Sequence, residues 1–460
     1  LALQDEIEWL EEKPIAAILN SVANTIINSD DVRDNLKMAG LDGSWSGLDG
    51  SGITVTVGDT GLDSGTNDAT MHPDFSDHIL GIYSWPIPFN RCSWNSPSDP
   101  GPCDDGAEDD HGHGTHVAGS VLGDGTASSG SVMGIAPEAQ LLVHAFQQSG
   151  GLGGIPDDLQ DMFDVAVENG STIHTNSWGS CDRPAQFAPC NNFGRYTAAS
   201  MQIDMGAITH KQLVIMFANG NDGDDYDGNG EIDEASLLWE ASAKNAISIG
   251  ASENYRPSRG GSADNAEGMA DFSGRGPTDD GRTKPDFVAP GTHIYSTKSR
   301  YSGPAASSCG WGSDSAVNDY CYMGGTSMAT PIAAGATALL LEHLIENVGL
   351  TDPTSYLVKA ILGASTSDMA GQYGSPTNGA GEAVPNMHEG NGRLNMYSAV
   401  QTSFVHNESL STTDDRGWSF NLPAGAHDLQ LALAYADPAA TPGVSPYLVN
   451  DLDLSVTDPT

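Results

Sequence analysis

The sequence predicts an α/β protein with a doubly wound, mostly parallel sheet, followed by a smaller all-β sandwich domain. Two observations predict this arrangement. From residue 52 to about residue 400, short apolar runs rich in β-branched residues alternate with segments of helical period, which is typical of a parallel sheet covered by helices. After that point, short alternating segments separated by Pro and Gly turns replace the helical pattern, and this favours a β-sandwich.

The individual elements follow from the same patterns. Buried strands are predicted at 52–59, 140–146, 172–179, 213–218 and 246–251, and helices at 157–170 and 195–210. Two further helices are predicted to begin near Thr326 and Thr354. A length of 460 residues is typical of two or three domains. We place the α/β domain at 20–400 and the sandwich at 401–460, where so few strands remain that the sandwich is expected to be incomplete.

The charge balance is strongly acidic. The chain has 18 Lys and Arg against 61 Asp and Glu, a formal net charge of −43. A field of this sign repels nucleic acid and anionic lipid, so we expect neither as a partner, and no apolar run reaches the roughly 18 residues that a membrane helix needs. The acidic residues are spread along the chain, which indicates a solvated anionic surface. Because the chain begins at Leu1 without Met or a signal peptide, we expect a processed product.

The six cysteines fall in three close pairs, none with the spacing of a zinc site. The pairs are Cys92 with Cys103, Cys181 with Cys190, and Cys309 with Cys321. Each pair brackets a segment rich in Pro, Gly, Ser or Asn, so three local disulfides are the simplest interpretation, although six cysteines allow fifteen connectivities. Such disulfides indicate an oxidising, extracellular compartment. The alternative is six free thiols in a cytosolic protein.

Three short motifs place an acid, an imidazole and a hydroxyl at strand ends or helix starts. Asp59 closes the first strand in VTVGDTGLD, His113 opens a helix in HGHGTHVAG, and Ser327 opens another in GGTSMATP. Covalent acyl transfer needs these groups, because the serine attacks, the histidine takes and returns its proton, and the aspartate orients the imidazole. The carboxyl ends of the strands in a doubly wound sheet share one edge, so the three side chains can converge there.

These motifs resemble those of subtilisin-family serine proteases, in that family's order of Asp, His and Ser. GDTGLD, HGTHVAG, TNSWG, ANGND, FSGRGPT, KPDFVAPG and GGTSMATP match in sequence order and span about residues 50–400. MHPDF, DGRTKPD and LVNDLDL bring the chain nearest to the alkaline-protease branch that carries a C-terminal β-sandwich. The resemblance implies a secreted, monomeric endopeptidase that acts on proteins or peptides and is made with an N-terminal propeptide, which serves as inhibitor and chaperone. Residues 1–19 resemble the tail of such a propeptide, the alternative being a helix of the mature enzyme.

The resemblance also assigns roles to single residues. It implies that Asp59 is the orienting acid, His113 the base and Ser327 the nucleophile. Asn221 of the GNDG turn is the implied donor to the oxyanion, while Asn219 caps or braces that turn. An amide suits the donor role because it does not titrate.

The substrate is expected to add as a strand along SWG, at Ser177, Trp178 and Gly179, with Gly220 on the other side of the cleft. Trp178 is implied to border the pocket for the residue before the scissile bond, and packing in the core is its other possible role. No acid is evident at the base of that pocket, which favours apolar or mixed side chains there.

The histidines of HGHGTH allow a second interpretation. His113 and His116 lie one helical turn apart and could hold zinc with Asp109 or Asp110. The match of the whole string to the protease motif favours the base, with His111 in a loop near the site and His116 buried in the helix.

The segment DYDGNGEID follows Asn221 closely and predicts a Ca²⁺ loop. It has ligands at the first, third, fifth, seventh and ninth positions of an EF-hand-like loop, with Gly230 at the sixth. These ligands are Asp225, Asp227, Asn229, the carbonyl of Glu231, and Asp233. At position twelve Ser236 stands where a bidentate Glu is expected, so Glu234 or a distant carboxylate would have to complete the shell. The alternative is a solvated acidic turn, and Asn450–Leu454 is a weaker second candidate.

Two other function classes remain open from sequence. A non-proteolytic binding protein on an inactive protease fold is opposed by the presence of all four candidate catalytic residues. A transpeptidase or macrocyclase on the same fold would pass the acyl group to an amine, and it usually carries an inserted cap that this chain lacks.

Overall fold

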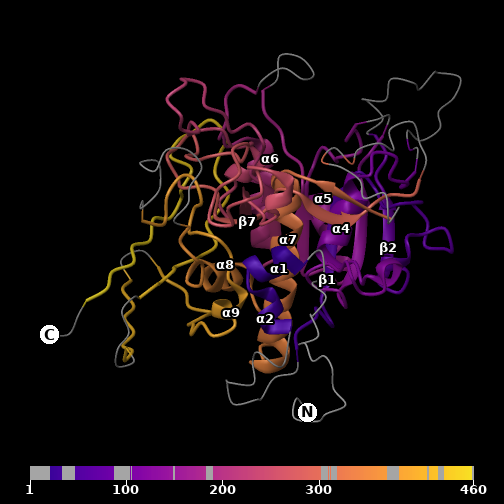
Figure 1. Ribbon diagram of the computed structural model, residues 1–460. Helices are drawn as coiled ribbons and strands as arrows, with labels where there is room; N and C mark the ends of the chain where they lie inside the picture. The colour runs from indigo at the N-terminus through magenta and orange to yellow at the C-terminus, as the bar shows by residue number, and fades with distance from the viewer. Residues whose placement is uncertain are drawn as a thin grey trace, which may run out of the picture.

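The computed structural model describes residues 21–33, 47–87, 104, 106–148, 151–182, 190–301, 309, 311, 319–369, 383–411, 414–422 and 429–457. Its centre is a seven-stranded sheet in the order β2-β3-β1-β4-β5-β6-β7, with every pair parallel (Figure 1). The strands are β1 (Thr54–Asp59), β2 (Ile79–Ser84), β3 (Gln140–Ala145), β4 (Ile173–Asn176), β5 (Val214–Ala218), β6 (Ile247–Ser252) and β7 (Phe287–Pro290). The chain leaves β3 on one side of β1 and enters β4 on the other, so the topological switch point lies at β1, where doubly wound sheets bind ligands.

Helices cover both faces of this sheet. They are α1 (Ser21–Ile26), α2 (Ser29–Arg33), α4 (His113–Leu122), α5 (Gln160–Glu168), α6 (Ala198–Thr209), α7 (Thr326–Glu342), α8 (Ser355–Gly363) and α9 (Met396–Ala399). α4 and α7 pack on one face and α5 and α6 on the other. An antiparallel pair, β8 (Ile294–Thr297) and β9 (Tyr320–Met323), leads into α7. The predicted α/β class is therefore correct.

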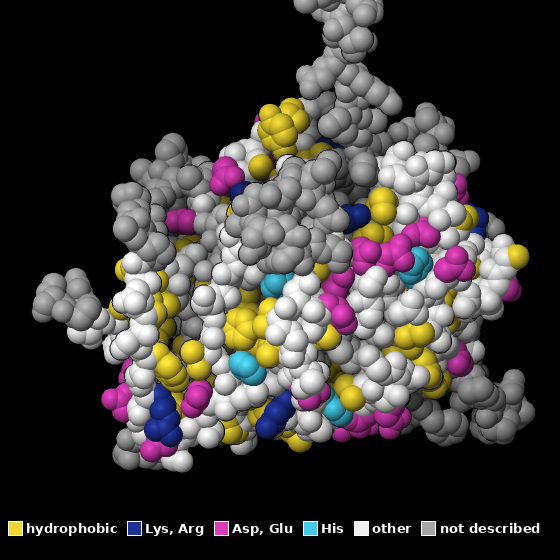
Figure 2. All heavy atoms as spheres, turned by 90° about the horizontal axis from the view of Figure 1, so that it is seen from below, with side chains coloured by type: hydrophobic (Ala, Val, Ile, Leu, Met, Phe, Trp, Pro, Cys, Tyr) yellow, Lys and Arg dark blue, Asp and Glu magenta, His cyan; other side chains and the backbone are white. Residues whose placement is uncertain are grey.

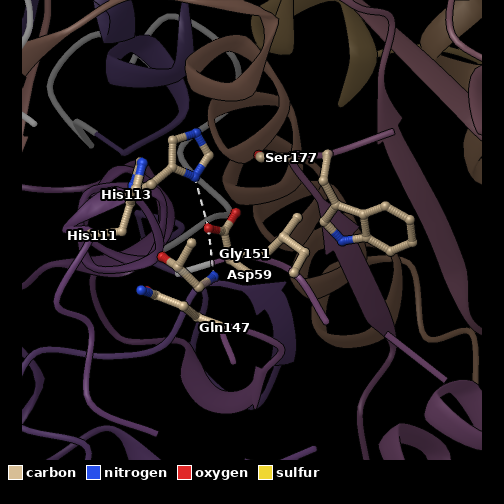
Figure 3. A pocket seen from close by; sticks show the side chains of 9 residues that line it. Asp59, His111, His113, Gln147, Gly151 and Ser177 are labelled. Atoms are coloured by element: carbon tan, nitrogen blue, oxygen red, sulfur yellow. Dashed lines mark hydrogen bonds and ion pairs between the residues drawn. The ribbon is translucent and has the colours of Figure 1, made fainter. Parts of the chain in front are cut away.

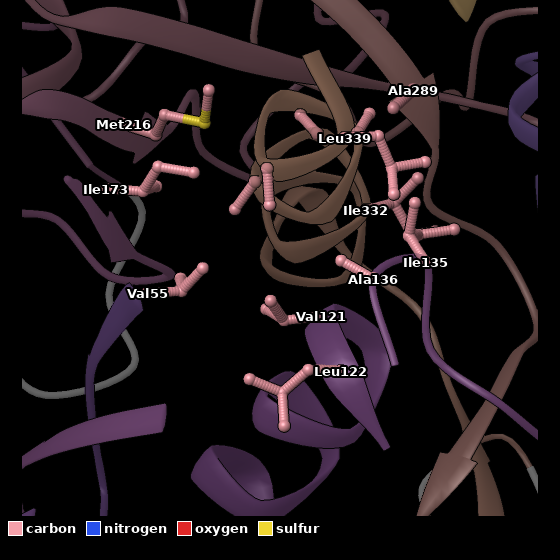
Figure 4. Close-up of a cluster of buried hydrophobic side chains, with 14 of the residues drawn as sticks. Val55, Val121, Leu122, Ile135, Ala136, Ile173, Met216, Ala289, Ile332 and Leu339 are labelled. Atoms are coloured by element: carbon pink, nitrogen blue, oxygen red, sulfur yellow. The ribbon is translucent and has the colours of Figure 1, made fainter. Parts of the chain in front are cut away.

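The core follows from the alternation of side chains along the strands. On one face Val55, Ile173 and Met216 pack against Ile332 and Leu339 of α7 (Figure 4). On the other face a smaller cluster joins aromatic and aliphatic side chains of β3, β5, α5 and α6. The segment Thr326–Asn347 is apolar and long enough to cross a membrane, but 94% of its apolar window is buried inside the structure. It is the central helix of the fold.

The sequence predicted the boundaries of the central strands closely, but it did not predict several other strands. All five predicted strands and all five predicted helices, including the one expected to begin at His113, correspond to elements of the structure. The strands β2, β7, β8 and β9 were not predicted. β2 is half-exposed along its length, so its apolar residues alternate less clearly than those of the buried strands. The predicted N-terminal extension 1–19 lies outside the described residues.

Beyond residue 400 the predicted β-sandwich is not shown. The described residues of 401–457 form no strand, although Trp418, Phe420 and Leu422 keep the alternating pattern and are each more than half exposed. An alternating pattern becomes a sheet only where a neighbouring strand pairs its backbone groups. A later part of the segment packs on the α/β domain instead, where the Tyr447 ring stacks on Tyr196 at 4.7 Å between centroids.

Asp437 fixes that later segment. It is 1% exposed and accepts hydrogen bonds from Lys244 Nζ at 2.5 Å and from the backbone N–H of Asn450 at 2.7 Å. The side chain of Asn450 also donates to Asp437, at 3.1 Å. Asn450, part of the weaker calcium candidate, is therefore a hydrogen-bond partner in this contact.

Carboxylates lie in several groups over the surface drawn in Figure 2, with few lysines and arginines among them. This distribution agrees with the spread of acidic residues along the chain.

Candidate active site

Asp59 and His113 meet at the carboxyl edge of the sheet. Asp59 is the last residue of β1 and His113 the first residue of α4. Their side chains are joined by a hydrogen bond of 2.7 Å from His113 Nδ1 to Asp59 Oδ1. The same oxygen accepts the backbone N–H of Thr60 at 2.7 Å, so the next residue in the chain also fixes the orientation of the carboxylate. The imidazole side chain keeps 21% of its surface exposed, whereas the Asp59 side chain keeps 3%.

This environment favours a protonated His113. Burial alone lowers the pKa of His113, but the charge of Asp59, the hydrogen bond to it and the charge of Asp109 together outweigh burial and raise that pKa above its ordinary value. An imidazole that is readily protonated beside a buried carboxylate suits a general base that must hold a proton during a reaction.

Ser327 is the second residue of α7, directly after the Gly324–Gly325 turn. Two hydrogen bonds join it to Ser177, the residue that follows β4. Ser327 Oγ donates to the Ser177 carbonyl at 3.0 Å, and Ser177 Oγ donates to the Ser327 carbonyl at 2.9 Å. The hydroxyl of Ser327 therefore uses a backbone carbonyl as its acceptor in this structure, rather than the imidazole of His113. Catalytic hydrogen bonds often tighten only when substrate binds.

A pocket of about 250 Å³ opens beside Asp59 and His113, and Ser327 is not among its lining residues (Figure 3). Asp59, His113, Ser177 and Trp178 line it, together with His111 and Gln147. In Figure 3, His111 and Gln147 lie on one side of Asp59 and Ser177 lies on the other. The structure thus brings the predicted acid, the predicted base and the first predicted substrate residue to one opening.

Trp178 packs in the core and also lines the pocket. It is 8% exposed, and its ring packs edge-on against Phe146 and Phe217. Its indole N–H donates to the carbonyl of Gly58 at 3.0 Å. One edge of a core residue therefore forms part of the pocket wall.

The amide of Asn221 is oriented by Thr326. Asn221 Oδ1 accepts both the N–H of Thr326 at 2.8 Å and its hydroxyl at 2.9 Å. The hydroxyl in turn accepts the N–H of Gly220 at 3.2 Å. With the oxygen held in this way, Nδ2 is the atom left to donate to a substrate. Asn219 instead braces the turn, because its buried Nδ2 donates to the carbonyl of Gly274 at 2.6 Å.

The glycines of the predicted substrate cleft share one neighbour. A β-carbon on Gly179 would lie 2.8 Å from Leu238 Cδ1, and one on Gly220 would lie 2.8 Å from Leu238 Cγ. Gly220 also has a φ of +110°, which disfavours any side chain. Leu238 therefore fills the space next to both glycines.

The acidic loop brings three of the five predicted ligands together. Side-chain oxygens of Asp225, Asp227 and Asp233 all lie within 4.8 Å of one another. Asn229 Oδ1 accepts the N–H of Glu231 at 2.7 Å and its Nδ2 donates to Asp227, so the loop is closed by its own hydrogen bonds.

Two features of the loop bear on a metal. Three clustered carboxylates are the donor set that a hard cation such as Ca²⁺ prefers, so the residues fit the ion. Ser236, at the twelfth position, is 2% exposed, and its Oγ accepts the N–H of Arg275 at 2.9 Å. It belongs to the core, and any further ligand would have to come from elsewhere.

The zinc interpretation of HGHGTH does not fit the geometry. His116 is fully buried and its Nε2 donates to the carbonyls of Ile294 and Cys321, at 3.1 and 3.2 Å. Burial lowers the pKa of His116 to about 3, so it stays neutral. Asp109 is fully committed to backbone and hydroxyl donors near the start of α4. From sequence, Asp109 was considered only as a zinc ligand and Thr326 was given no role in the site. Both residues act through contacts that are distant in sequence, Asp109 with Thr60 and Thr326 with Asn221.

Two of the three predicted disulfides are present. Cys181 bonds to Cys190 and Cys309 to Cys321, with Cα–Cα distances of 5.6 Å in both cases. The third pair, Cys92 and Cys103, lies outside the described residues.

Comparison with known proteins identifies the family of this chain. A model described as the subtilase family matches residues 50–392. The chain is similar to the serine protease AprX of Bacillus subtilis (strain 168), with 31% identity over 350 residues that cover 74% of this chain and 67% of AprX. It is also similar to the serine protease/ABC transporter B family protein tagB of Dictyostelium discoideum, with 27% identity over 90% of this chain and 24% of tagB.

The chain spans about a quarter of the length of tagB and of its relative tagD. Among solved structures, Sphericase matches with a TM-score of 0.50 and 22% identity, over 81% of this chain and 96% of that one. At this identity the likeness shows the fold alone. The family model and AprX go further, and from them the chain belongs to the subtilase family and is a subtilisin-like serine peptidase.

Proposed function

We propose that this peptidase is a secreted, calcium-stabilised endopeptidase whose catalytic triad is Asp59, His113 and Ser327. The observation that carries the proposal is the 2.7 Å bond between His113 and Asp59 at a pocket that Ser177 also lines, with Ser177 in turn bonded twice to Ser327. The end of β1 supplies the acid, the start of α4 supplies the base, and the start of α7 supplies the hydroxyl, which is linked to the pocket through Ser177.

The reaction would begin with a peptide that adds as a strand along Ser177–Gly179. For attack, the Ser327 hydroxyl must leave the Ser177 carbonyl and turn to the imidazole. His113 then takes the proton as Oγ bonds to the scissile carbonyl carbon, and the ionised Asp59 stabilises the imidazolium. His113 returns the proton to the leaving amine, and water hydrolyses the ester by the same steps.

The developing oxyanion would be held by two donors. Asn221 offers Nδ2, because Thr326 occupies its Oδ1. The backbone N–H of Ser327 lies at the start of α7, where the first N–H groups of a helix have no partner within the helix. Donors fixed before the reaction stabilise charge without having to reorganise.

Calcium would bind in the acidic loop through Asp225, Asp227 and Asp233, with Asn229 and the carbonyl of Glu231 as the other predicted ligands. When bound, the ion would neutralise the clustered carboxylates and stiffen the loop that follows Asn221. The coupling has a structural basis, because the hydroxyl of Tyr226 in the loop donates to the carbonyl of Asp222, the residue after Asn221, at 3.3 Å.

Secretion is supported by the disulfides Cys181–Cys190 and Cys309–Cys321, since such bonds persist in oxidising compartments. The proposal includes a monomer that acts on proteins or peptides, with residues 1–19 as the end of its propeptide.

Labelling with a fluorophosphonate tests the nucleophile. We expect an adduct on Ser327, located by peptide mass spectrometry, that disappears in His113→Ala. The control is Ser177→Ala, which should still be labelled at Ser327. An adduct on another residue, or one that persists at full rate without His113, would refute the triad. Product masses distinguish hydrolysis, which adds one water per cleavage, from transfer to an amine.

Calcium is tested by chelation followed by metal analysis of the same sample. We expect turnover to fall before the protein unfolds, and Asp227→Asn to reproduce the fall. The matched control is Asp68→Asn, an exposed aspartate in another turn that accepts its hydrogen bonds from Thr70 and Thr66. Unchanged turnover in a sample shown to have lost its loop metal would disprove the coupling.

A further inference from the structure

Asp109 is a buried carboxylate that accepts four hydrogen bonds. It is 0% exposed. Oδ1 accepts the Thr60 hydroxyl at 2.8 Å and the N–H of Gly112 at 2.7 Å. Oδ2 accepts the N–H of Thr115 at 2.7 Å and its hydroxyl at 2.6 Å. All four donors need an acceptor, so only an ionised carboxylate satisfies them together.

These bonds tie two elements to each other. Gly112 and Thr115 belong to the cap and first turn of α4, which begins at His113, while Thr60 directly follows Asp59 at the end of β1. The Thr60 hydroxyl that donates to Asp109 also accepts the N–H of Gly114 at 2.7 Å. The start of the helix and the end of the strand therefore share one acceptor.

A second set of contacts also connects the start of α4 to the segment that follows β1. The hydroxyl of Thr115 accepts the N–H of Asp63 at 2.8 Å, and the N–H of Asp109 donates to the carbonyl of Asp63 at 2.9 Å. The backbones approach closely as well, since a β-carbon on Gly114 would lie 2.3 Å from the carbonyl oxygen of Gly61. Little freedom remains for His113 to move relative to Asp59.

We propose that Asp109 is a positioning residue for the peptidase reaction: its carboxylate locks the first turn of α4 onto the end of β1 and so holds the His113 imidazole against Asp59. The inference rests on the proposed role of His113 as the base, and it adds a second carboxylate, after Asp59, to the groups that hold this imidazole.

The negative charge of Asp109 also acts on His113, in addition to the hydrogen bonds that fix the start of α4. Although burial opposes it, this charge helps to raise the pKa of His113, after the larger contribution of Asp59. Burial also raises the pKa of Asp109 itself, and its four donors oppose that rise. The other titratable groups near the imidazole are His111, whose ring centroid lies 6.0 Å from that of His113, and His116 on the same helix.

The test compares Asp109→Asn with Asp74→Asn in the full chain. Asp74 is equally buried but accepts from Ala127 and Tyr320, so it controls for the loss of a buried carboxylate away from His113. The readouts are kcat and KM on a quenched fluorescent peptide that the unmodified chain cleaves, and the His113 pKa from an NMR titration of labelled histidine.

We expect kcat of Asp109→Asn to fall about 10- to 100-fold with KM nearly unchanged, because the reacting groups lose their alignment. The pKa of His113 should fall by about half a unit to one unit, because a nearby negative charge is lost. Asp74→Asn should show neither change. Equal effects in both variants, or an Asp109→Asn enzyme with the original kcat and His113 pKa, would overturn the proposal.

Thr115→Val keeps the charge and removes the hydroxyl, so it serves if Asp109→Asn does not fold. We expect a lower kcat with a smaller shift of the His113 pKa, and recovery of kcat in Thr115→Ser. Equal kcat values in Thr115→Val and Thr115→Ser would count against the proposal. His113→Ala separates the two claims, because full activity without the imidazole refutes the proposed base, whereas inactivity of this variant alone leaves the role of Asp109 to the other measurements.

Discussion

The buried histidine His144 should make the fold sensitive to acid. It lies on β3 with no exposed surface, among the rings of Tyr83, Trp85 and Phe146. Its Nδ1 faces Nε2 of His174 at 3.3 Å, and its Nε2 has no hydrogen-bond partner among the described residues. Burial lowers the pKa of His144 from 6.5 to about 3, because a charged imidazole cannot be solvated there.

The sign of the effect follows from that shift. In the unfolded chain His144 takes up a proton below pH 6.5, whereas in the fold it remains neutral down to about pH 3. Its contribution to stability is therefore complete above pH 6.5 and is lost as the pH falls from 6.5 toward 3. Each pH unit costs about 1.4 kcal/mol, so the loss at pH 5 is about 2 kcal/mol.

The perturbation is His144→Phe, measured by urea unfolding at pH 7 and pH 5 in a Ser327→Ala background that prevents autolysis. Between these pH values the free energy of unfolding should fall by about 2 kcal/mol less in His144→Phe than in its parent. An equal fall in His144→Phe and its parent would refute the reasoning.

Three further predictions concern the site and its support. Asn221→Ala should lower kcat about 10²- to 10³-fold with little change in KM, a magnitude already known for this donor in a subtilisin and adopted from there; kinetics on a peptide substrate would check it. Leu238→Ala should enlarge the pocket beside the cleft glycines and shift cleavage toward larger side chains before the scissile bond, as measured with a peptide library. Asp437→Ala should lower the free energy of unfolding by about 3 kcal/mol, because the buried Lys244 ammonium then keeps only the more distant carboxylate of Asp204, at 3.9 Å. An unchanged Tm in thermal unfolding would show that the Asp437 contact does not stabilise the fold.

The parts of the fold that could be predicted are those that leave a pattern of apolar and polar residues within one short segment. Several central strands were predictable because they are buried on both faces and read as continuous apolar runs, as in VIMFA of β5. β2 escaped because it lies at the sheet edge, half-exposed. The segment after residue 400 is a different case, since Trp418 and Phe420 keep a strand-like alternation while the described residues there form no strand and the predicted sandwich is not shown. Pairing is a property of two segments, and one segment cannot reveal it.

The same limit applies to the site. Asp59, His113 and Ser327 stand in short motifs and could be proposed from sequence. Asp109 could not be given its role, because its decisive bond to Thr60 joins residues 49 positions apart. Asp225 and its neighbours were predictable as a cluster because the spacing of the loop is itself local.

The hydrogen bonds between Thr326 and Asn221 determine which of its two orientations the Asn221 side-chain amide adopts. In the proposed reaction, a reversed amide of Asn221 would point its carbonyl oxygen at the oxyanion and repel it, so only one of two nearly isosteric orientations of the amide would support catalysis. Thr326 discriminates between them with two donors aimed at one oxygen. Thr326 immediately precedes Ser327 in α7. The residue that orients the Asn221 amide and the proposed nucleophile therefore belong to one helix, and a displacement of α7 would move both of them together.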